Sequence, residues 1–358
     1  DTLSSVDPGV DQLPESASLM GRLPPSRFHD GHAGVCVFDH LCVACHGLSV
    51  LVTARRGDQH RTVLFDVGPY AHVWLDNAER LAVDLAAIEL VFLSHWHADH
   101  SGGFPAVVGA IAAARSAAGR PPPIVDLHPV RPDQRGVRLA DGSIALLPPD
   151  PTFAEIEAAG GAIERHAVAH GVADLLVGSG LIERVTDYET GLVGHHSFVG
   201  DDCRPDPLIL DERFLAGFVR GRGVTVLSAC SHAGVVNACL GAMALAPGEP
   251  VDTVLGGYHL AGASMEPRIG DTVRDLAERV RPRIVAPGHC TGWRAKAALA
   301  DRFAPNRYGP SVVGSRYVLS AEDAPASVSP GSAGDGSSGA MGSHGEASCA
   351  QRVLTPAT

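Results

Sequence analysis

Three histidines and one aspartate crowd into residues 95–100, which read HWHADH. Neutral imidazole and carboxylate oxygen are good ligands for zinc, and also for iron or manganese. The alternating pair His95 and His97 can point at one metal, whereas Asp99 and His100 can turn toward a second. Two divalent ions about 3.5–4 Å apart would share a bridging hydroxide and act as nucleophile generator and Lewis acid. The segment therefore predicts a dinuclear metal site, with Asp99 also as a catalytic residue that orients the hydroxide.

Further ligands must come from the rest of the chain, because this segment supplies only four. In the last third of the sequence, His232, His259 and His289 each follow a short apolar run. We expect His232 and His289 to be metal ligands; the alternative for each is a histidine that caps a helix or orients a ligand by hydrogen bonding. For His259 two roles stay open, a metal ligand and a catalytic residue that contacts the substrate.

The middle of the chain contains ionisable residues with weaker signals. Arg184 could bind a substrate phosphate or carboxylate by a bidentate contact, although a surface salt bridge is an equally good interpretation. His128 is the second substrate-binding candidate; the alternative interpretation is an exposed or packed histidine without a catalytic role. The same two interpretations apply to the histidines at 195–196. His166 and His170 are four residues apart and could form a metal pair on a helix, but the glycine that follows favours a solvated helix face.

The elements that must position these residues alternate between strand and helix. A fully buried strand at 90–93 ends directly at the histidine-rich segment, and a glycine pair follows that segment. Alternating strands and helices predict an α/β layered fold, in which ligands bind at the carboxyl ends of strands. In the last third, strands that lead through a histidine-containing turn into a helix are expected at 224–227, 251–255 and 283–286. Apolar spacing predicts helices at 76–89, at 104–118 and near 152–165.

The same pass along the chain predicts its domain organisation. Residues 1–33 are expected to be a polar lead-in to a single domain at 34–320. Within that domain we expect an insertion or lid at about 120–200, since long loops in compact domains are usually functional. Residues 321–358 are rich in Ser, Gly, Ala and Pro with almost no large apolar side chains. Such a segment cannot offset the entropy of ordering, so a disordered low-complexity tail is predicted.

Composition excludes several classes of function. The 358 residues are 45% apolar and carry 40 acidic against 28 basic side chains, a formal charge of −12. Polyanions are repelled by such a chain, so nucleic acid is not expected as the partner, although a positive metal site still attracts a small anion. No apolar run reaches the length of a membrane helix. Eight scattered cysteines suit a reducing compartment, and we expect a cytoplasmic protein, with a processed N-terminus left open because the sequence begins at Asp1.

The pattern His-x-His-x-Asp-His after a buried strand resembles the signature of the metallo-β-lactamase superfamily. Later segments resemble one branch of it, the metal-dependent enzymes of the 7,8-dihydropterin-6-methyl-4-(β-D-ribofuranosyl)-aminobenzene-5'-phosphate synthase type. This resemblance covers about residues 34–320. It implies a four-layered αβ/βα sandwich, two bound divalent metals and a pterin-like or phosphorylated substrate. The segments that carry the branch resemblance are 45–49 (CHGLS), 128–129 (HP), 179–186 (SGLIERVT), 211–212 (DE), 229–237 (ACSHAGVVN), 256–260 (GGYHL) and 287–292 (PGHCTG).

Two residues depart from the patterns of these relatives. Cys45 stands where the branch commonly has Glu, and Cys230 stands where many superfamily members have a bridging Asp. Either His232 replaces that Asp, or Cys230 is a thiolate ligand or an outer partner of one. A thiolate favours zinc, which is therefore the expected metal, with iron and manganese as alternatives.

Three functions remain open at this point. The first is a metal-dependent hydrolase of a small, anionic phosphorylated, ester or pterin-like substrate. The second is a synthase that joins a pterin to an arylamine and releases diphosphate, which turnover assays with and without amine would separate from the first. The third is an iron-bound redox or pterin-binding protein, which the metal content after purification would identify.

Overall fold

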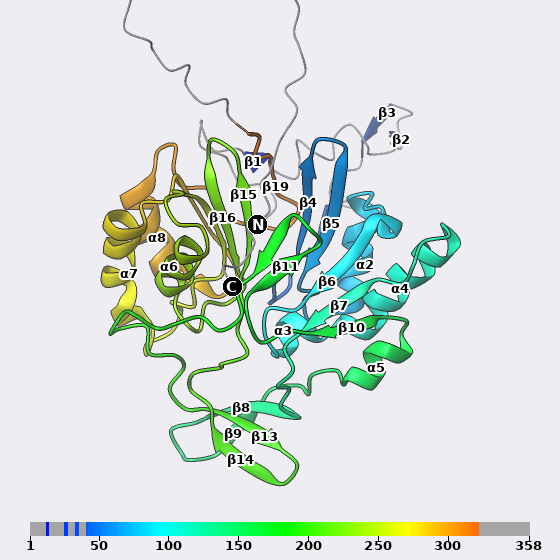
Figure 1. Cartoon of the computed structure of the whole chain (residues 1–358). Helices are drawn as coiled ribbons and strands as arrows, with labels where there is room; N and C mark the ends of the chain where they lie inside the picture. The colour runs from blue at the N-terminus through cyan, green and yellow to red at the C-terminus, as the bar shows by residue number, and fades with distance from the viewer. Residues whose placement is uncertain (1–11, 14–24, 28–32, 36–40, 322–358) are drawn as a thin grey trace, which may run out of the picture.

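The computed structural model describes residues 12–13, 25–27, 33–35 and 41–321. Two β-sheets pack face to face, and helices cover the outer face of each sheet (Figure 1). Two short pairings lie outside these sheets. β1 (Gln12–Leu13) pairs with β19 (Arg316–Tyr317), and β2 (Pro25–Arg27) pairs with β3 (Ala33–Val35). Most of the expected lead-in, and all of the tail expected at 321–358 except Ala321, lie outside the described residues.

The first sheet has five strands, of which four run parallel. They are β4 (Val50–Arg56), β5 (Gln59–Phe65), β6 (Ile88–Phe92), β7 (Ile124–Leu127) and β10 (Ala162–Arg165). The order is β10-β7-β6-β5-β4, with β4 antiparallel at the edge. Toward their carboxyl ends the inner strands β5, β6 and β7 are buried and mostly apolar, because both faces of a parallel sheet are covered.

The second sheet has six strands in the order β11-β12-β15-β16-β17-β18. Its last three strands run parallel and match the three strands expected from the sequence. Their carboxyl ends therefore meet at one edge of the sandwich. The strands are β11 (His170–Val172), β12 (Leu176–Gly178), β15 (Leu215–Val219), β16 (Gly223–Ser228), β17 (Val251–Gly256) and β18 (Ile284–Pro287).

Three apolar layers hold the molecule together, and they confirm the predicted αβ/βα sandwich. Between the sheets, Phe65 and Phe92 of the first sheet pack in one cluster with Leu215 and Leu227 of the second. The other two layers lie between each sheet and its helices. The first sheet is covered by α2 (Ala71–Arg80), α4 (Phe104–Ala117) and α5 (Phe153–Ala158), the second by α6 (Val235–Leu245), α7 (Ile269–Asp275) and α8 (Trp293–Phe303). Among the described residues, no helix is both long and apolar enough to cross a membrane.

Two of the three helices expected from apolar spacing have different bounds. The helix expected at 104–118 is confirmed as α4, but the one expected at 76–89 is wrong at both ends. α2 ends near Ala82, whose φ of 52° stops the helix, and a separate 3-10 turn spans Leu85–Ala87. The helix expected near 152–165 ends after Ala158, because two glycines follow and the chain continues as β10.

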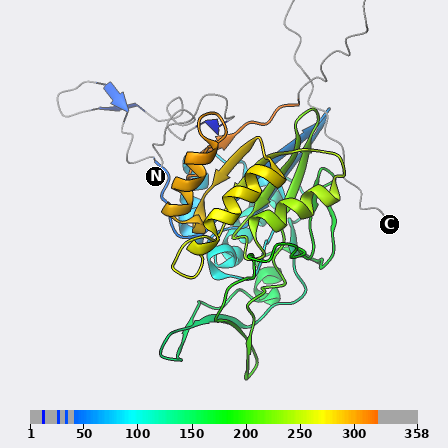
Figure 2. The same ribbon diagram turned by 90° about the vertical axis from the view of Figure 1, so that its left-hand side faces the viewer.

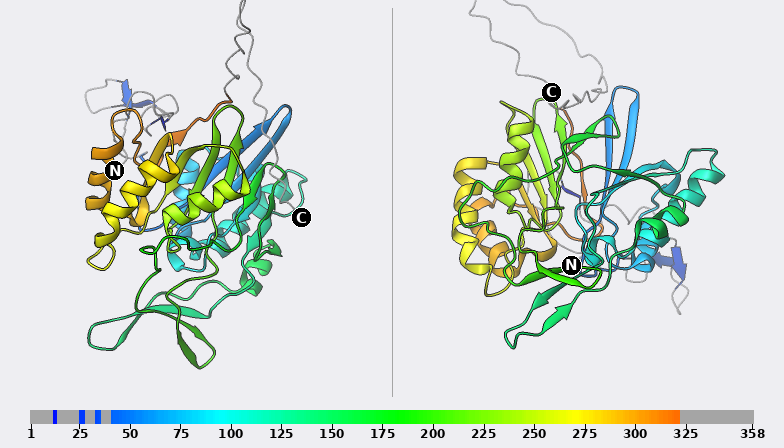
Figure 3. Two further views of the ribbon diagram at one scale, coloured as in Figure 1. Left: turned by 60° about the vertical axis from the view of Figure 1, so that its left-hand side comes forward. Right: turned by 60° about the horizontal axis from the view of Figure 1, so that its bottom comes forward.

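A third, smaller sheet projects from one end of the sandwich (Figures 2 and 3). It contains β8 (Gln134–Arg138), β9 (Ile144–Leu146), β13 (His195–Val199) and β14 (Asp202–Pro205), in the order β14-β13-β8-β9. We refer to these four strands as the small sheet. The stretch at 120–200, expected as an insertion or lid, therefore divides: β7, β10, β11 and β12 belong to the sandwich, and β8, β9 and β13 to the small sheet.

Candidate metal centre

The histidine-rich segment leaves the end of β6 and forms one helical turn, α3 (Ala98–Ser101), at the end of the sandwich nearer the small sheet (Figure 1). His95 and His100 are fully buried and His97 is 5% exposed. The segment thus turns its imidazoles into the protein rather than toward solvent. A His-rich surface turn would leave these rings in water, so burial itself argues for a built site.

One group of four donor atoms combines this segment with the second sheet. Asp99, His100, Cys230 and His289 each offer one ligand atom, and all four atoms lie within 4.8 Å of one another. His100 Nε2 lies 3.2 Å from Cys230 Sγ and 3.2 Å from His289 Nε2. His289 Nε2 lies 3.2 Å from a carboxylate oxygen of Asp99. These donors surround a common point, as the ligands of one metal ion do.

A second group contains His95, Cys230 and His232, again with ligand atoms within 4.8 Å. His97 adjoins it: its Nδ1 lies 3.1 Å from His95 Nε2, and its ring lies 5.0 Å from that of His232. Both ring nitrogens of His232 are buried and have no hydrogen-bond partner among the described residues. Unpaired buried nitrogens are costly in a protein, and a metal ion would satisfy one of them. Cys230 belongs to both groups.

Asp66 and Ser94 orient the histidines of this centre. The carboxylate of Asp66, at the end of β5, accepts hydrogen bonds from His100 Nδ1 at 2.8 Å and from the backbone N–H of Ser94 at 2.7 Å. The Ser94 hydroxyl lies 2.8 Å from the same carboxylate and 2.9 Å from His95 Nδ1. A carboxylate that holds one nitrogen of an imidazole leaves the other nitrogen for a metal. Asp66 was not predicted as a site residue, although its position directly after a buried strand was an available signal.

The carboxylates of Asp211 and Glu212 fix the backbone on either side of the centre. Glu212 accepts hydrogen bonds from the backbone N–H groups of His232, at 2.8 Å, and Ala233, at 2.6 Å. Asp211 accepts one from the backbone N–H of Trp96, at 2.8 Å. Both carboxylates are buried, so they hold the two ligand-bearing turns rigidly. These residues were noted only as part of the branch resemblance, not as part of the site.

The parallel strands β16, β17 and β18 deliver Cys230, His259 and His289 to one edge. The turn after β17 requires glycine, because a Cβ on Gly256 would lie 1.7 Å from the carbonyl oxygen of Ser228. This close approach brings the His259 ring to 4.3 Å from that of His232. His259 groups with Cys230 and Cys290, again with ligand atoms within 4.8 Å. Cys290 was not singled out from the sequence.

Two more histidines reach the centre from outside the predicted set. His195, on β13 of the small sheet, places its Nε2 2.9 Å from His97 Nε2, and its Nδ1 donates to the Asp206 carbonyl at 2.7 Å. His46 lies 3.5 Å from the Asp99 carboxylate. His195 had been set between a packed and a functional histidine, and the structure places it against the site. Its neighbour His196 instead accepts a hydrogen bond from Arg138 at 2.9 Å.

The structure does not bring Arg184 and His128 into either donor group. Arg184 donates to the carbonyl of Leu208, and its charge acts on Glu212. His128 accepts a hydrogen bond from the backbone N–H of Val130 at 3.2 Å, and its own carbonyl accepts from the indole of Trp96 at 3.3 Å. Both residues lie near the turns that carry the centre, without a ligand atom in it.

The ionisable groups of the centre differ in the direction in which their pKa values are shifted. Burial lowers the pKa of His95, His97 and His232 well below the ordinary value, which keeps these imidazoles neutral with lone pairs available. Burial also disfavours a charge on His100, but Asp99 and Asp66 overcome it and raise its pKa to about 9. The raised pKa means that the two carboxylates stabilise a positive charge at this position, which a proton on His100 supplies. A divalent cation would supply that charge and displace the proton.

Burial raises the pKa of Asp99, but the charge of His100 and a hydrogen bond from His289 hold it well below the ordinary value. Asp99 is therefore a carboxylate throughout the physiological range. Burial raises the pKa of Cys230 well above the ordinary value. A cation between the surrounding donors would reverse this and favour the thiolate. The donor set of imidazole, carboxylate and sulfur thus fits divalent metal ions.

Comparisons with known proteins bear on the family and the fold of this chain. A model of the metallo-beta-lactamase superfamily matches residues 43–254. The chain is 27% identical over 264 residues to a 7,8-dihydropterin-6-methyl-4-(beta-D-ribofuranosyl)-aminobenzene-5'-phosphate synthase of Methanocaldococcus jannaschii, a match that covers 72% of this chain and 85% of the relative. Among solved structures, Tm1679, a metal-dependent hydrolase of the beta-lactamase superfamily, aligns with a TM-score of 0.58 and 23% identity, over 75% of this chain and 98% of the other. The matched range 43–254 contains both the histidine-rich segment and the turn with Cys230 and His232.

Proposed function

We propose, because the chain belongs to the metallo-β-lactamase superfamily, that it is a hydrolase with two divalent metal ions at the candidate metal centre. Its substrate would be a small anionic molecule with a phosphorylated, ester or pterin-like group. The observation that carries the proposal is the sharing of Cys230 between two donor groups, next to a His232 ring whose two buried nitrogens have no hydrogen-bond partner among the described residues.

The residues divide into two ligand sets. His95, His97 and His232 would hold one ion. Asp99, His100 and His289 would hold the other, with Cys230 between the two sets. Imidazole and thiolate together favour zinc. Two such ions supply Lewis acidity and the activation of water as a nucleophile.

The chain's own groups prepare this site for an anion. Asp99 is the only carboxylate among the donor groups of the centre, whereas two divalent ions bring four positive charges. The site therefore stays electropositive when loaded, which favours a negatively charged substrate. Asp66 keeps the proton of His100 on Nδ1, and Glu212 keeps the His232 turn in place, so neither ligand must reorganise during reaction.

The residues that would contact the substrate are assigned from their positions around the centre. His259 lies beside His232 with its Nδ1 buried and without a hydrogen-bond partner in the described part of the chain, and we assign it contact with the substrate. The small sheet, which brings His195 to the centre, would act as the lid. Arg184 and His128 stay predicted substrate contacts, reached only if the substrate extends beyond the two donor groups.

Metal content and turnover test this proposal together. We expect about two zinc ions per chain after purification, because one tetrahedral ion cannot use all the donors present. The loaded protein should hydrolyse an activated phosphodiester such as bis(4-nitrophenyl) phosphate, and chelation should abolish that turnover. Elemental analysis showing no metal, or the same metal content in wild type and in a variant with both His95 and His100 replaced, would contradict the proposal.

A synthase is the second candidate, favoured by the name of the relative from Methanocaldococcus jannaschii. Such an enzyme would join a pterin to an arylamine with loss of diphosphate. It needs a second organic substrate, whereas hydrolysis needs only water. Diphosphate release from a pterin diphosphate should be unchanged by added arylamine if the protein is a hydrolase. Release that depends on the amine, with a coupled product seen by mass spectrometry, would favour the synthase instead.

A further inference from the structure

We propose that Asp126, His166 and His170 form a further metal site, separate from the candidate metal centre, for one divalent transition-metal ion such as Zn²⁺. The three side chains each offer one ligand atom, and these atoms lie within 4.8 Å of one another. One carboxylate oxygen of Asp126 lies 2.6 Å from His170 Nε2 and 3.3 Å from His166 Nδ1. Two imidazole nitrogens and one carboxylate are a ligand set that proteins use for zinc with an open fourth position.

The hydrogen bonding of His170 points to a cation at this place. Its Nδ1 lies 3.0 Å from the carbonyl oxygen of Val168, which can only accept, so Nδ1 carries a proton. In the neutral ring, Nε2 then has a lone pair, and it faces a carboxylate oxygen of Asp126 at 2.6 Å. Two acceptors at that distance repel unless a proton or a metal ion lies between them.

His166 decides between a proton and a metal. Its Nδ1 is buried and faces the same Asp126 oxygen, but it makes no hydrogen bond among the described residues. A single proton can serve only one of these two contacts, whereas one metal ion would satisfy all three donor atoms. The arrangement also repeats the candidate metal centre, where Asp66 holds Nδ1 of His100 and leaves its Nε2 directed at other donors.

The surrounding structure prepares the three ligands. Arg213 donates to the other carboxylate oxygen of Asp126 at 2.8 Å, which leaves one oxygen for the histidines. The rings of His166 and His170 stack with centroids 3.8 Å apart and planes 19° apart, so both nitrogens reach the same side. The spacing of these two histidines had suggested that they lie on a helix. Instead, His166 follows β10 and His170 begins β11.

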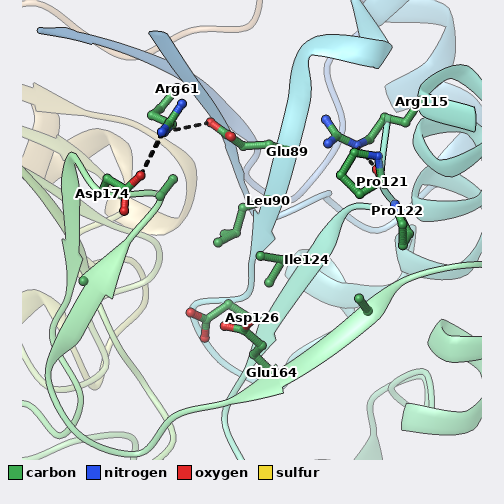
Figure 4. A pocket seen from close by; sticks show the side chains of 13 residues that line it. Arg61, Glu89, Leu90, Arg115, Pro121, Pro122, Ile124, Asp126, Glu164 and Asp174 are labelled. Carbon is green, nitrogen blue, oxygen red and sulfur yellow. Dashed lines mark hydrogen bonds and ion pairs between the residues drawn. The ribbon is translucent and has the colours of Figure 1, made fainter. Parts of the chain in front are cut away.

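The site lies beside a cavity and joins the two sheets of the sandwich. Asp126 lines one end of a cavity of about 640 Å³ between the first sheet and β11, with Arg61, Glu89 and Asp174 at the other end (Figure 4). Water or a small ligand in this cavity could complete the coordination. Asp126 belongs to the first sheet and His170 to the second, so a bound ion would tie the two sheets together.

Zinc binding by the full-length, metal-loaded protein tests this site without reference to turnover. In equilibrium dialysis against Zn²⁺, wild type should bind about one ion more than His166→Gln or His170→Gln. Because an ion that binds only the folded state stabilises it, added Zn²⁺ should raise the Tm of wild type by several degrees and leave both variants unshifted. His60→Gln replaces an exposed histidine outside any donor group and should behave as wild type. Equal zinc content in all four proteins, or the same Tm response, overturns the proposal.

A measurement on the wild type alone covers the case in which a variant fails to fold. The side chains of His166 and His170 are 30% and 14% exposed, so diethyl pyrocarbonate can reach them. Zinc added to the metal-loaded protein should slow their modification, followed by peptide mass spectrometry, while His60 is modified at an unchanged rate. Unchanged modification of both histidines at saturating zinc would mean that a proton alone joins His170 to Asp126.

Discussion

Cys230 is the residue that most distinguishes this candidate metal centre, because its sulfur belongs to all three donor groups found there among the described residues. Sulfur is a softer ligand than carboxylate, so Cys230, if it binds the proposed metal ions, would shift metal preference toward zinc. Among the described residues, Asp99 is the only carboxylate in the donor groups of the centre, and its pKa lies far below the physiological range. Its charge, rather than its shape, should therefore matter most.

Replacing Asp99 with Asn tests this role. The change is nearly isosteric, so the fold should survive, but the charge is lost. We expect hydrolysis of an activated phosphodiester to fall at least about 100-fold, the low end for losing a positioned acid/base group. Turnover and metal content should be measured in the same preparation. Asp76→Asn, an exposed aspartate on α2, is the control. Near-normal turnover with both metals retained would move the role to His232 or His259.

The pH dependence of stability should reveal Asp150, which lies after β9 and accepts a hydrogen bond from the Ser101 hydroxyl. Burial raises its pKa to about 6, although that hydrogen bond and the charge of Arg135 oppose it. An unfolded Asp has a pKa of about 3.9, so raising the pH from about 4 to 6 removes a proton from the unfolded chain first and costs the folded state stability. The cost above pH 6 is of order 3 kcal/mol.

Asp150→Asn should therefore gain stability relative to wild type as the pH rises from about 4 to 7, by roughly 2–3 kcal/mol. The check is urea unfolding of both proteins, with metals chelated, at several pH values. Asp76→Asn should run parallel to wild type throughout. A constant difference between Asp150→Asn and wild type would mean that Asp150 is already ionised at low pH in the folded protein.

Among individual residues, the sequence predicted those whose partners in the candidate metal centre are close in the chain or follow the end of a strand. His95, Asp99, His100, His232 and His289 do meet in space. Asp66, Glu212 and His195 could not be assigned, because each acts on a group between 20 and 98 residues away, and only the packing of the sheets brings them together. Hydrogen bonds across that separation leave no periodic trace in the sequence.

Among the elements, the small sheet has the most direct effect on the candidate metal centre. Arg135 of β8 donates to the carbonyl of Trp96 at 2.6 Å and to the carboxylate of Asp211 at 2.5 Å. His195 of β13 touches His97. The small sheet is thus tied to the ligand turn by two neighbouring strands, and its position is coupled to the geometry of the ligands.

Replacing His195 with Gln should test that coupling. His95, His97 and His232 remain, so we expect both metal ions to stay bound. Turnover should fall roughly 10–100-fold, the usual effect of losing a partner that orients a metal ligand. His196→Gln is a matched control, because the adjacent ring contacts Arg138 and not the centre. Equal turnover in the two variants would show that the small sheet does not position His97.

Elements were predictable where one signal dominated. The strands β6, β16, β17 and β18 follow from short, mostly apolar runs, and the helix α4 follows from clear helical spacing. The helix expected at 76–89 was broken by a left-handed residue, Ala82, which no propensity favours. The strands at 124–127, 170–172 and 176–178 were hidden in a stretch rich in proline and glycine, because strands of three or four residues are too short to show a periodic pattern.

For the whole molecule, the sandwich and the small sheet together contain the described strands from β4 to β18. Residues 322–358 contain almost no large apolar side chains, so they have little to bury. Removing them should leave the Tm, the metal content and the turnover unchanged. Comparison of the two proteins by thermal unfolding and elemental analysis decides this. A shortened protein that aggregates or loses metal would show that the segment contributes to the fold.

The candidate metal centre joins parts of the chain that are made at very different times. His100 and His289 are 189 residues apart, yet their Nε2 atoms lie 3.2 Å from one another. At synthesis rates of about 5–20 residues per second, the second follows the first onto the growing chain after roughly 10–40 s. A nascent chain therefore exposes half of a ligand set with nothing to complete it. The proposed ligand set that includes His289 would therefore be complete only after elongation has passed that residue, later than the set of His95, His97 and His232.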